Sequence, residues 1–107
     1  MSLPIISSKQ QFGPEKWHYV YILRCADNTL YTGWTNNIAH RLYIHNIGQG
    51  AKYTKSRLPV KLVYWEVLSS KQEAMKREYQ IKRYTRAKKL KLIKGDATAK
   101  KGGSLPP

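Results

Sequence analysis

The sequence predicts an α+β fold, in which helices flank a three-stranded, antiparallel-containing sheet and the elements follow the order β-β-α-β-α-α. Three observations lead to this prediction. Two stretches near the N-terminus and one near the middle are dense in β-branched and aromatic residues, which suit a pleated, half-buried surface. Turn residues separate the first two stretches. Helix-capping residues follow the second stretch and the third, so helices are expected after each of these. Helices grouped on an antiparallel sheet are typical of α+β domains.

The first two strands are predicted to form a hairpin. Residues 17–25 (WHYVYILRC) and 29–34 (TLYTGW) make the strands, and the Asp27-Asn28 pair between them is a turn signal. Side chains alternate along a strand. The first strand therefore has two faces, with Tyr19, Tyr21 and Leu23 on one and Val20 and Ile22 on the other. Residues 60–68 (VKLVYWEVL) form the third strand.

Three helices are predicted around these strands. Residues 37–47 follow the N-cap candidates Thr35 and Asn36 and end before Gly48. Residues 71–84 follow Ser69 or Ser70 as a cap, and a third helix covers about 86–93. Residues 49–59 carry several cations and are expected to form a basic loop.

The length of 107 residues fits one domain with one modest core. Residues 17–93 are expected to form it, between a flexible leader at 1–16 and a disordered basic tail at 94–107. The single cysteine, Cys25, excludes an internal disulfide and a cysteine-based zinc site. The sequence has neither an apolar run long enough to span a bilayer nor a signal peptide. We therefore expect a cytoplasmic protein that has no membrane partner.

The charge balance points to a polyanionic partner. Twenty lysines and arginines against six acidic residues give a formal net charge of +14. Such an excess favours binding to nucleic acid. Most of it lies between Lys71 and Lys101, where Glu73, Glu78 and Asp96 are the only acids. The alternative is a solvated helix face followed by a charged tail.

Glu78 is an acid within an apolar stripe of the second predicted helix. Steps of three and four residues place it with Ala74, Met75 and Ile81, on the face expected to meet the sheet. A buried carboxylate is costly unless a cation accompanies it. A metal ion or a neighbouring arginine would serve. The alternative is a surface pair with Lys82, worth about 0.2–0.5 kcal/mol.

Arg41 and His45 lie four residues apart on the first predicted helix and so project from one face. A guanidinium beside an imidazole suits a phosphodiester. The guanidinium can bind two non-bridging oxygens, and the imidazole can donate or accept a proton. Such pairs also occur on the solvent-exposed faces of many helices.

Tyrosines form a third candidate group. Tyr19 and Tyr21 lie across the predicted hairpin from Tyr31, an arrangement in which aromatic side chains usually pack together. Tyrosine is a poor base at its ordinary pKa of about 10. A catalytic tyrosine therefore needs an adjacent cation or metal-bound water that favours the phenolate.

Together these residues resemble the signature of the GIY-YIG endonucleases. The stretches Tyr19-Val-Tyr21 and Tyr31-Thr-Gly33 resemble the two tripeptides of that family, although the first has tyrosine for glycine and the second threonine for isoleucine. Arg41 and Glu78 fall where the family keeps its arginine and its metal-binding glutamate. The resemblance covers residues 17–93 and is strongest to the small single-domain bacterial members, of which the runs GAKYT (50–54) and PVKLV (59–63) are typical. Leu90 lies near the place where many relatives carry asparagine.

The resemblance implies a site built around one divalent ion, Mg²⁺ or Mn²⁺, held by Glu78 as the metal ligand and otherwise by water and phosphate. It implies Tyr21 as the general base, Arg41 as the clamp on the scissile phosphate and His45 as the residue that orients or assists Tyr21. Tyr31 would share the water or phosphate network. Gly33 would allow a close approach to the site. Nucleic acid would be bound through its phosphates by Lys52, Lys55, Arg57, Arg77, Lys82, Arg83 and Arg86.

The predicted function is that of a divalent-metal-dependent endonuclease that hydrolyses phosphodiester bonds in DNA, with structured or single-stranded DNA of repair or recombination among the candidate substrates. Two alternatives stay open. One is a non-catalytic nucleic-acid-binding module with a GIY-YIG fold, and the other is a ribosome- or RNA-associated basic protein. No small-molecule cofactor is expected, and the chain is expected to be a monomer.

Overall fold

The central element of the sheet is β1 (His18–Arg24), which pairs antiparallel with a neighbour on each side. In this computed structural model, which describes residues 17–95 and 100–101, the strand order is β2-β1-β3-β4. The neighbours of β1 are β2 (Leu30–Thr35) and β3 (Lys61–Leu68). A central strand is covered on both faces, and five consecutive residues of β1 are buried accordingly.

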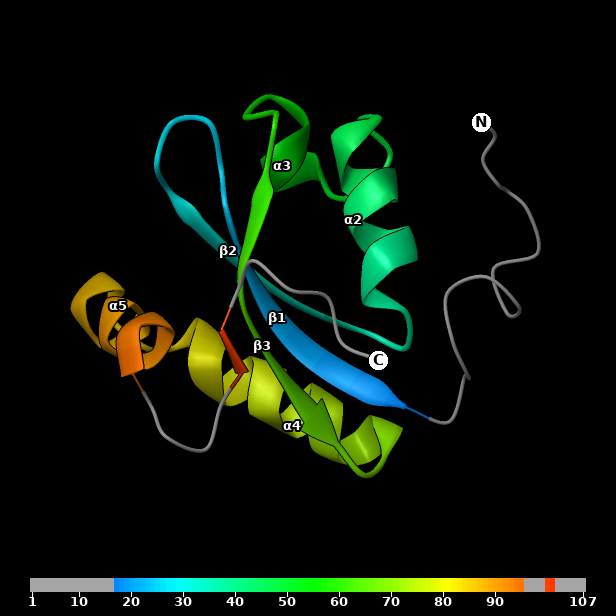
Figure 1. The fold of residues 1–107 in the computed structure, drawn as a ribbon, viewed down its shortest axis with the longest axis vertical. Coiled ribbons are helices and arrows are strands. Elements are labelled where there is room, and N and C mark those ends of the chain that lie inside the picture. The colour runs from blue at the N-terminus through cyan, green and yellow to red at the C-terminus, as the bar shows by residue number, and fades with distance from the viewer. Residues whose placement is uncertain (1–16, 96–99, 102–107) are drawn as a thin grey trace.

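Helices cover both faces of this sheet. Figure 1 shows α2 (Ile38–Asn46) and α3 (Lys52–Lys55) on one side, and α4 (Lys71–Lys82) and α5 (Arg86–Gly95) on the other. The predicted α+β class and the order of its strands and longer helices are confirmed. Among the residues described, no helix is long and apolar enough to cross a membrane.

Two predictions about the segments outside the main strands and helices need correction. The expected basic loop at 49–59 contains the short helix α3. The tail expected to be disordered from residue 94 begins inside α5, and its residues Lys100–Lys101 form β4, which pairs with β3 and gives the sheet a fourth strand. The rest of that tail and the predicted leader, 1–16, lie outside the described residues.

The helix starts follow local hydrogen-bonding chemistry. Ser70 caps α4 as predicted, because its side chain accepts a hydrogen bond from the backbone of Glu73. The cap of α2 is Asn37, whose side chain accepts from the backbone of His40. The predicted caps Thr35 and Asn36 were therefore placed too early. Thr35 instead accepts a hydrogen bond from the backbone of Asn37, which holds the turn before the helix.

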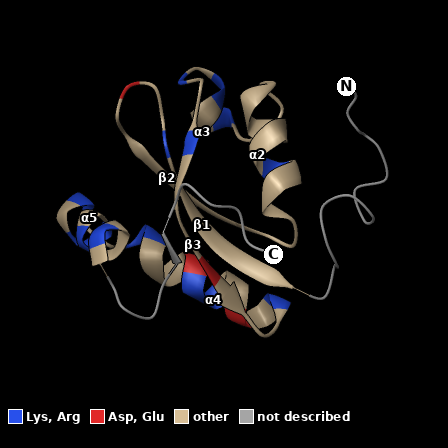
Figure 2. Ribbon diagram, viewed as in Figure 1, with Lys and Arg blue, Asp and Glu red and all other residues tan. Residues whose placement is uncertain are grey.

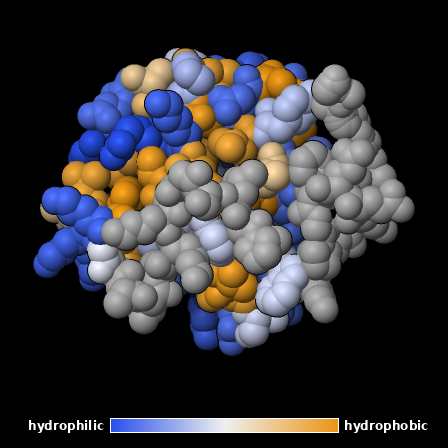
Figure 3. All heavy atoms as spheres, in the orientation of Figure 1, coloured by the Kyte–Doolittle hydropathy of each residue, from blue (hydrophilic) through white to orange (hydrophobic). Residues whose placement is uncertain are grey.

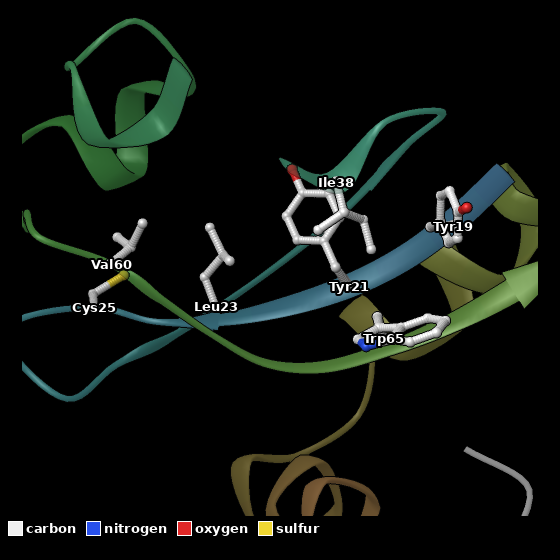
Figure 4. Packing of buried hydrophobic residues seen from close by; sticks show 7 residues of the cluster. All are labelled: Tyr19, Tyr21, Leu23, Cys25, Ile38, Val60 and Trp65. Atoms are coloured by element: carbon white, nitrogen blue, oxygen red, sulfur yellow. The ribbon is translucent and has the colours of Figure 1, made fainter. Parts of the chain in front are cut away.

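The alternation predicted for β1 divides the core into two clusters, one on each face of the sheet. The α2/α3 face carries Tyr19, Tyr21, Leu23, Cys25, Ile38, Val60 and Trp65. The α4/α5 face carries Val20, Ile22, Tyr64, Ala74, Ile81 and Leu92. The first cluster is the one with more polar atoms, and Figure 4 shows the hydroxyl of Tyr21 projecting from it away from the sheet.

Candidate active site

Tyr21 stands on the central strand with its ring on the α2/α3 face, and only 2% of its surface is exposed. It pairs in register with Gly33 of β2. A Cβ at Gly33 would lie 2.6 Å from the phenolic oxygen of Tyr21, so any larger residue there would displace the ring. The glycine of the second tripeptide is thus required by the neighbouring tyrosine. The family resemblance implies, for this glycine, a close approach of the strand to the site.

His45, predicted to share a helix face with Arg41, is fully buried behind Tyr21. Its Nε2 lies 3.0 Å from the Tyr21 hydroxyl, and its Nδ1 lies 2.9 Å from Oγ1 of Thr54. The Thr54 hydroxyl in turn donates to the carbonyl oxygen of Ala51 at 3.2 Å. Because His45 is enclosed, it can act on a substrate only through Tyr21.

The segment from Gly50 to Thr54 holds both functional side chains of α2. The carbonyl oxygen of Gly50 accepts a hydrogen bond from Nη2 of Arg41 at 3.1 Å. A Cβ at Gly50 would collide with the imidazole of His45, so this position must be glycine while His45 keeps its place. Sequence analysis missed the roles of Gly50 and Thr54, although the run GAKYT that contains them was among the stretches typical of the family's small members.

Aromatic rings connect this network to the surface. The ring centroid of Tyr31 lies 5.3 Å from that of His45 and 6.5 Å from that of Tyr21. On its other side, Tyr31 stacks on Tyr53, at 6.1 Å and 21°. Tyr53 is 40% exposed and carries the guanidinium of Arg57 over its ring. The predicted packing of Tyr31 near Tyr21 across the hairpin is therefore present, whereas Tyr19 lies opposite Thr35 and its ring contacts that of Trp65.

Glu78 reaches the site from the helix on the opposite face. The helix α4 packs against β1 and the edge strand β2. The Glu78 carboxylate lies close enough to Tyr21 that its negative charge contributes to raising the pKa of the phenol. It also pairs with Lys82, Nζ to Oε2 at 3.4 Å, and its side chain is 21% exposed. Of the two interpretations of Glu78, the pair with Lys82 is present, and a metal ion at this carboxylate stays a prediction. Its predicted neighbour Met75 points outward and is 46% exposed.

Burial sets the protonation states of the network. It raises the pKa of Tyr21 well above its ordinary value, with the neighbouring Tyr31 and Glu78 adding to the rise and the nearby Arg41 opposing it. Burial, helped by the positive charge of Arg41, lowers the pKa of His45 to about 4. At neutral pH the phenol and the imidazole are therefore both uncharged. The cation that a catalytic tyrosine needs is present as Arg41.

Two arginines predicted to contact nucleic acid are engaged in holding the fold. Arg77 lies on the α4/α5 side and binds both carboxylate oxygens of Glu66, at 2.9 and 3.0 Å. Arg57 binds Asp27 at 3.0 Å and the backbone carbonyl of Tyr53 at 2.7 Å. These donors have acceptors within the protein, and the phosphate contacts expected of the two arginines stay predictions.

The other predicted cations differ in their surroundings. Lys82 pairs with Glu78, and Arg83 donates to the hydroxyl of Tyr79 at 3.2 Å. Lys52 and Lys55 on α3 and Arg86 at the start of α5 are exposed. Figure 2 shows lysines and arginines along α5 and around α3. In Figure 3 hydrophilic residues gather over the β1–β2 turn and over α5, with hydrophobic residues between them.

The donors available to a metal ion are few. Among the residues described, no three His, Cys, Asp or Glu side chains come together as a metal-binding cluster. Glu78 is the acid within electrostatic reach of Tyr21. One partly exposed carboxylate fits Mg²⁺ or Mn²⁺ held mainly by water and substrate phosphate, the common pattern for hard cations on phosphate substrates. It does not fit a dedicated protein cage.

The model of the GIY-YIG catalytic domain matches residues 17–91. The chain belongs to the GIY-YIG family. The match confirms the resemblance noted from the motifs, and the family is one of nucleases. The GIY-YIG domain occupies most of the chain, and its match ends within α5.

Similar proteins include other small members of the family. A UPF0213 protein of Staphylococcus haemolyticus is 62% identical over 76 residues, which cover 71% of this chain and 93% of the relative. One from Staphylococcus aureus (strain Mu3) is 60% identical over 77 residues, covering 72% and 94%. The solution structure of protein EF2693 from E. faecalis is 40% identical, covers 74% of this chain and 84% of its own, and has a TM-score of 0.52.

Proposed function

We propose that this GIY-YIG protein is a divalent-metal-dependent endonuclease that hydrolyses phosphodiester bonds in DNA. The observation that carries the proposal is the convergence of three elements on one phenol. Tyr21 of β1 has its pKa changed by Arg41 of α2 and by Glu78 of α4, which packs on the other face of the sheet. A base, a cation and an acid meeting at one point are the groups that phosphodiester hydrolysis requires.

Each residue has a separate task in this proposal. Arg41 binds the non-bridging oxygens of the scissile phosphate while the carbonyl of Gly50 holds its guanidinium in place. Tyr21 accepts a proton from the attacking water, and His45 holds the phenol from behind. Tyr31 packs against both rings and closes that side of the site.

Glu78 would hold the Mg²⁺ or Mn²⁺ ion. When bound, such an ion stabilises the charge that develops on the phosphate and on the leaving oxygen. In the structure, Lys82 forms an ion pair with this carboxylate. It is also the first of a series of exposed cations that continues into α5. Lys52 and Lys55 flank the other side, and these cations would bind the DNA backbone through its phosphates.

The proposed setting is the cytoplasm, in keeping with the single buried cysteine. Structured or single-stranded DNA of repair or recombination is the proposed substrate class. The described part of the chain is one small domain and the chain carries a net charge of +14, so shape and charge would govern binding more than the reading of base sequence.

The test is a cleavage panel of duplex, single-stranded, flap and junction DNA and of RNA, each with and without Mn²⁺. We expect the wild-type chain to cut at least one DNA structure only with the metal. Glu78→Gln should lower the rate by about 100- to 1000-fold or more while DNA affinity stays close to wild type. The matched control is Glu73→Gln, on the same helix and exposed, where it accepts a hydrogen bond from Ser69. Equal activity of Glu78→Gln and Glu73→Gln would remove Glu78 from the mechanism.

The second candidate is a nucleic-acid-binding module that does not cleave. The ion pair between Glu78 and Lys82 favours it, because a glutamate with this partner has a structural role already. A wild-type chain that binds DNA with strong salt dependence, yet leaves every substrate of the panel intact, would establish this candidate.

A further inference from the structure

Behind the phenol of Tyr21 runs a chain of hydrogen bonds that ends at a backbone carbonyl. The Tyr21 hydroxyl contacts Nε2 of His45, Nδ1 of His45 contacts the Thr54 hydroxyl, and Thr54 contacts the carbonyl oxygen of Ala51. Tyr21, His45 and Thr54 are all at least 98% buried. Because His45 and Thr54 are fully buried, water cannot supply a missing partner to either of them. The direction of each hydrogen bond therefore follows from counting protons.

A hydroxyl group has one proton to donate. The Ala51 carbonyl can only accept, so the Thr54 proton points to it and the Thr54 oxygen is left to accept from Nδ1 of His45. Neutral imidazole carries a single N–H. With Nδ1 protonated, Nε2 has a free lone pair and accepts the proton of the buried Tyr21 phenol. The opposite tautomer would leave that phenolic proton facing an N–H donor.

We propose that Thr54 is a positioning residue that holds His45 as its Nδ1–H tautomer, so that Tyr21 acts as a relay and His45 is the group in which the proton removed from water comes to rest. The tautomer follows from the hydrogen bonds alone. The catalytic half of this inference rests on the proposed nuclease function.

The proton balance of the step is simple. As the water oxygen bonds to phosphorus, one water proton passes to the phenolic oxygen of Tyr21, and the proton already on Tyr21 passes to Nε2 of His45. The bond from phosphorus to the leaving oxygen breaks, and the leaving oxygen takes a proton from solvent. His45 then returns its proton to solvent through Tyr21. The net reaction consumes one water, and Tyr21 never has to persist as a phenolate.

The buried position of His45 fits this role. Once protonated, its two N–H groups would face the oxygens of Tyr21 and Thr54, both of which can accept. Arg41 is the charged neighbour that disfavours the imidazolium. A phosphate bound to Arg41 would neutralise that charge. Proton uptake by His45 would therefore become easier when substrate is present.

The experiment combines ¹⁵N NMR of the histidine rings with cleavage kinetics on the full chain. In wild type near pH 7.5 we expect the His45 Nδ1 shift of a protonated nitrogen and the Nε2 shift of an unprotonated one. Thr54→Val keeps the side-chain shape but removes the acceptor, so the Nε2–H tautomer should grow and kcat should fall by about 10- to 100-fold with little change in KM. Thr54→Ser should restore both readouts, which a purely packing role would not explain.

A matched control is Thr32→Val, a buried threonine on the opposite face of the sheet, which should leave both the tautomer and kcat unchanged. An Nε2–H tautomer of His45 in the wild-type chain would overturn the inference, even if Thr54→Val did not fold. A wild-type chain with the expected tautomer but no cleavage of any substrate would overturn the proposed function and the relay, while leaving the Thr54–His45 assignment in place.

Discussion

Each face of the sheet carries a buried tyrosine whose hydroxyl enters a polar network, and the two networks are built differently. On the α2/α3 face, Tyr21 contacts the neutral His45, which contacts Thr54. On the α4/α5 face, the hydroxyl of Tyr64 donates to Glu66, which is bound by Arg77. Within the described part of the chain, the hydrogen bonds of the first network involve no acid, whereas the second is closed by a salt bridge.

The two arginines show the consequence. Arg77 donates to both oxygens of Glu66, to Gln80 and to Tyr84, so its charge and its N–H groups are used within the protein. Among the ion pairs of the described residues, none involves Arg41, which donates a hydrogen bond to the neutral carbonyl of Gly50. A positive charge that forms no ion pair, beside a neutral network, is suited to an incoming anion.

A raised pKa does not by itself separate the two faces. Burial raises the pKa of Tyr21 and of Tyr64 alike. The second cause differs, because the hydrogen bond to Glu66 raises the Tyr64 pKa further, whereas Arg41 lowers that of Tyr21. Each phenol also has a neighbour of the opposite charge, because Glu78 raises the Tyr21 pKa and Arg77 lowers that of Tyr64. The two tyrosines therefore differ in which charged neighbour acts more strongly, an arginine on Tyr21 and a glutamate on Tyr64.

The largest expected effect comes from exchanging each arginine for methionine. Arg41→Met should lower the cleavage rate by about 100- to 1000-fold, because the phosphate loses its cation, while the free energy of unfolding changes by about 1 kcal/mol or less. Arg77→Met should leave the half-buried Glu66 without its cation and lower the free energy of unfolding by about 2–3 kcal/mol. Activity per folded Arg77→Met molecule should stay at the wild-type level.

Urea unfolding and cleavage kinetics measure the two quantities separately. Equal losses of activity in the two variants, with stability corrected for, would mean that the faces do not divide into a structural and a functional one. Arg41 and Arg77 are comparable in kind, since both are arginines on helices that pack on the sheet.

A smaller effect is expected from pH. The His45 pKa falls to about 4 in the folded chain from an ordinary value of 6.5, so the unfolded chain binds the extra proton. The contribution of His45 to the free energy of unfolding is therefore fully present above about pH 6.5. It declines as pH falls toward 4, by up to about 1.4 kcal/mol per pH unit. The cationic neighbour is Arg41, and Tyr21, Tyr31 and Thr54 pack around the ring without an acid that would favour its charge.

Urea unfolding from pH 4.5 to 7.5 measures this slope, and His45→Gln supplies the reference without the titrating group. The difference in slope between the two proteins isolates the histidine from the carboxylates that titrate in the same range. A wild-type slope no steeper than that of His45→Gln would mean that the imidazole is protonated in the folded chain, contrary to a neutral network on this face.

Sequence reasoning found the strands, the longer helices and the family because these follow from local alternation, capping and spacing. It also found five residues that hydrogen bonds, ring contacts or electrostatic effects connect in the structure: Tyr21, Tyr31, Arg41, His45 and Glu78. It could not tell which residues of α4 face the sheet and which face solvent. Met75 fits the apolar stripe by its spacing, but it is exposed and does not contact the sheet.

The residues that sequence reasoning missed or misassigned depend on contacts between distant elements. Thr54 becomes important only because α3 lies against His45 of α2. From the sequence, Arg77 is expected to be a surface cation, because nothing in its helix shows that Glu66, on β3, faces it. A charged residue's role thus depends on which acid or base the fold sets against it, and single-sequence patterns carry little of that information.

The smallest expected effect contrasts two buried threonines, one on each face. The hydroxyl of Thr54 has two partners, whereas the hydroxyl of Thr32, opposite Ile22 in the register, has no hydrogen-bond partner among the residues that the structure describes. Thr32→Val removes a buried polar group that is unpaired, so it should raise the free energy of unfolding by about 1 kcal/mol. Thr54→Val, the same change on the other face, should lower it by about 1–2 kcal/mol because it leaves Nδ1 of His45 without an acceptor. Urea unfolding of both variants measures the opposite signs. A loss of stability in Thr32→Val comparable to that of Thr54→Val would show that the hydroxyl on the α4/α5 face also has a partner, and that the polar network is not confined to the α2/α3 face.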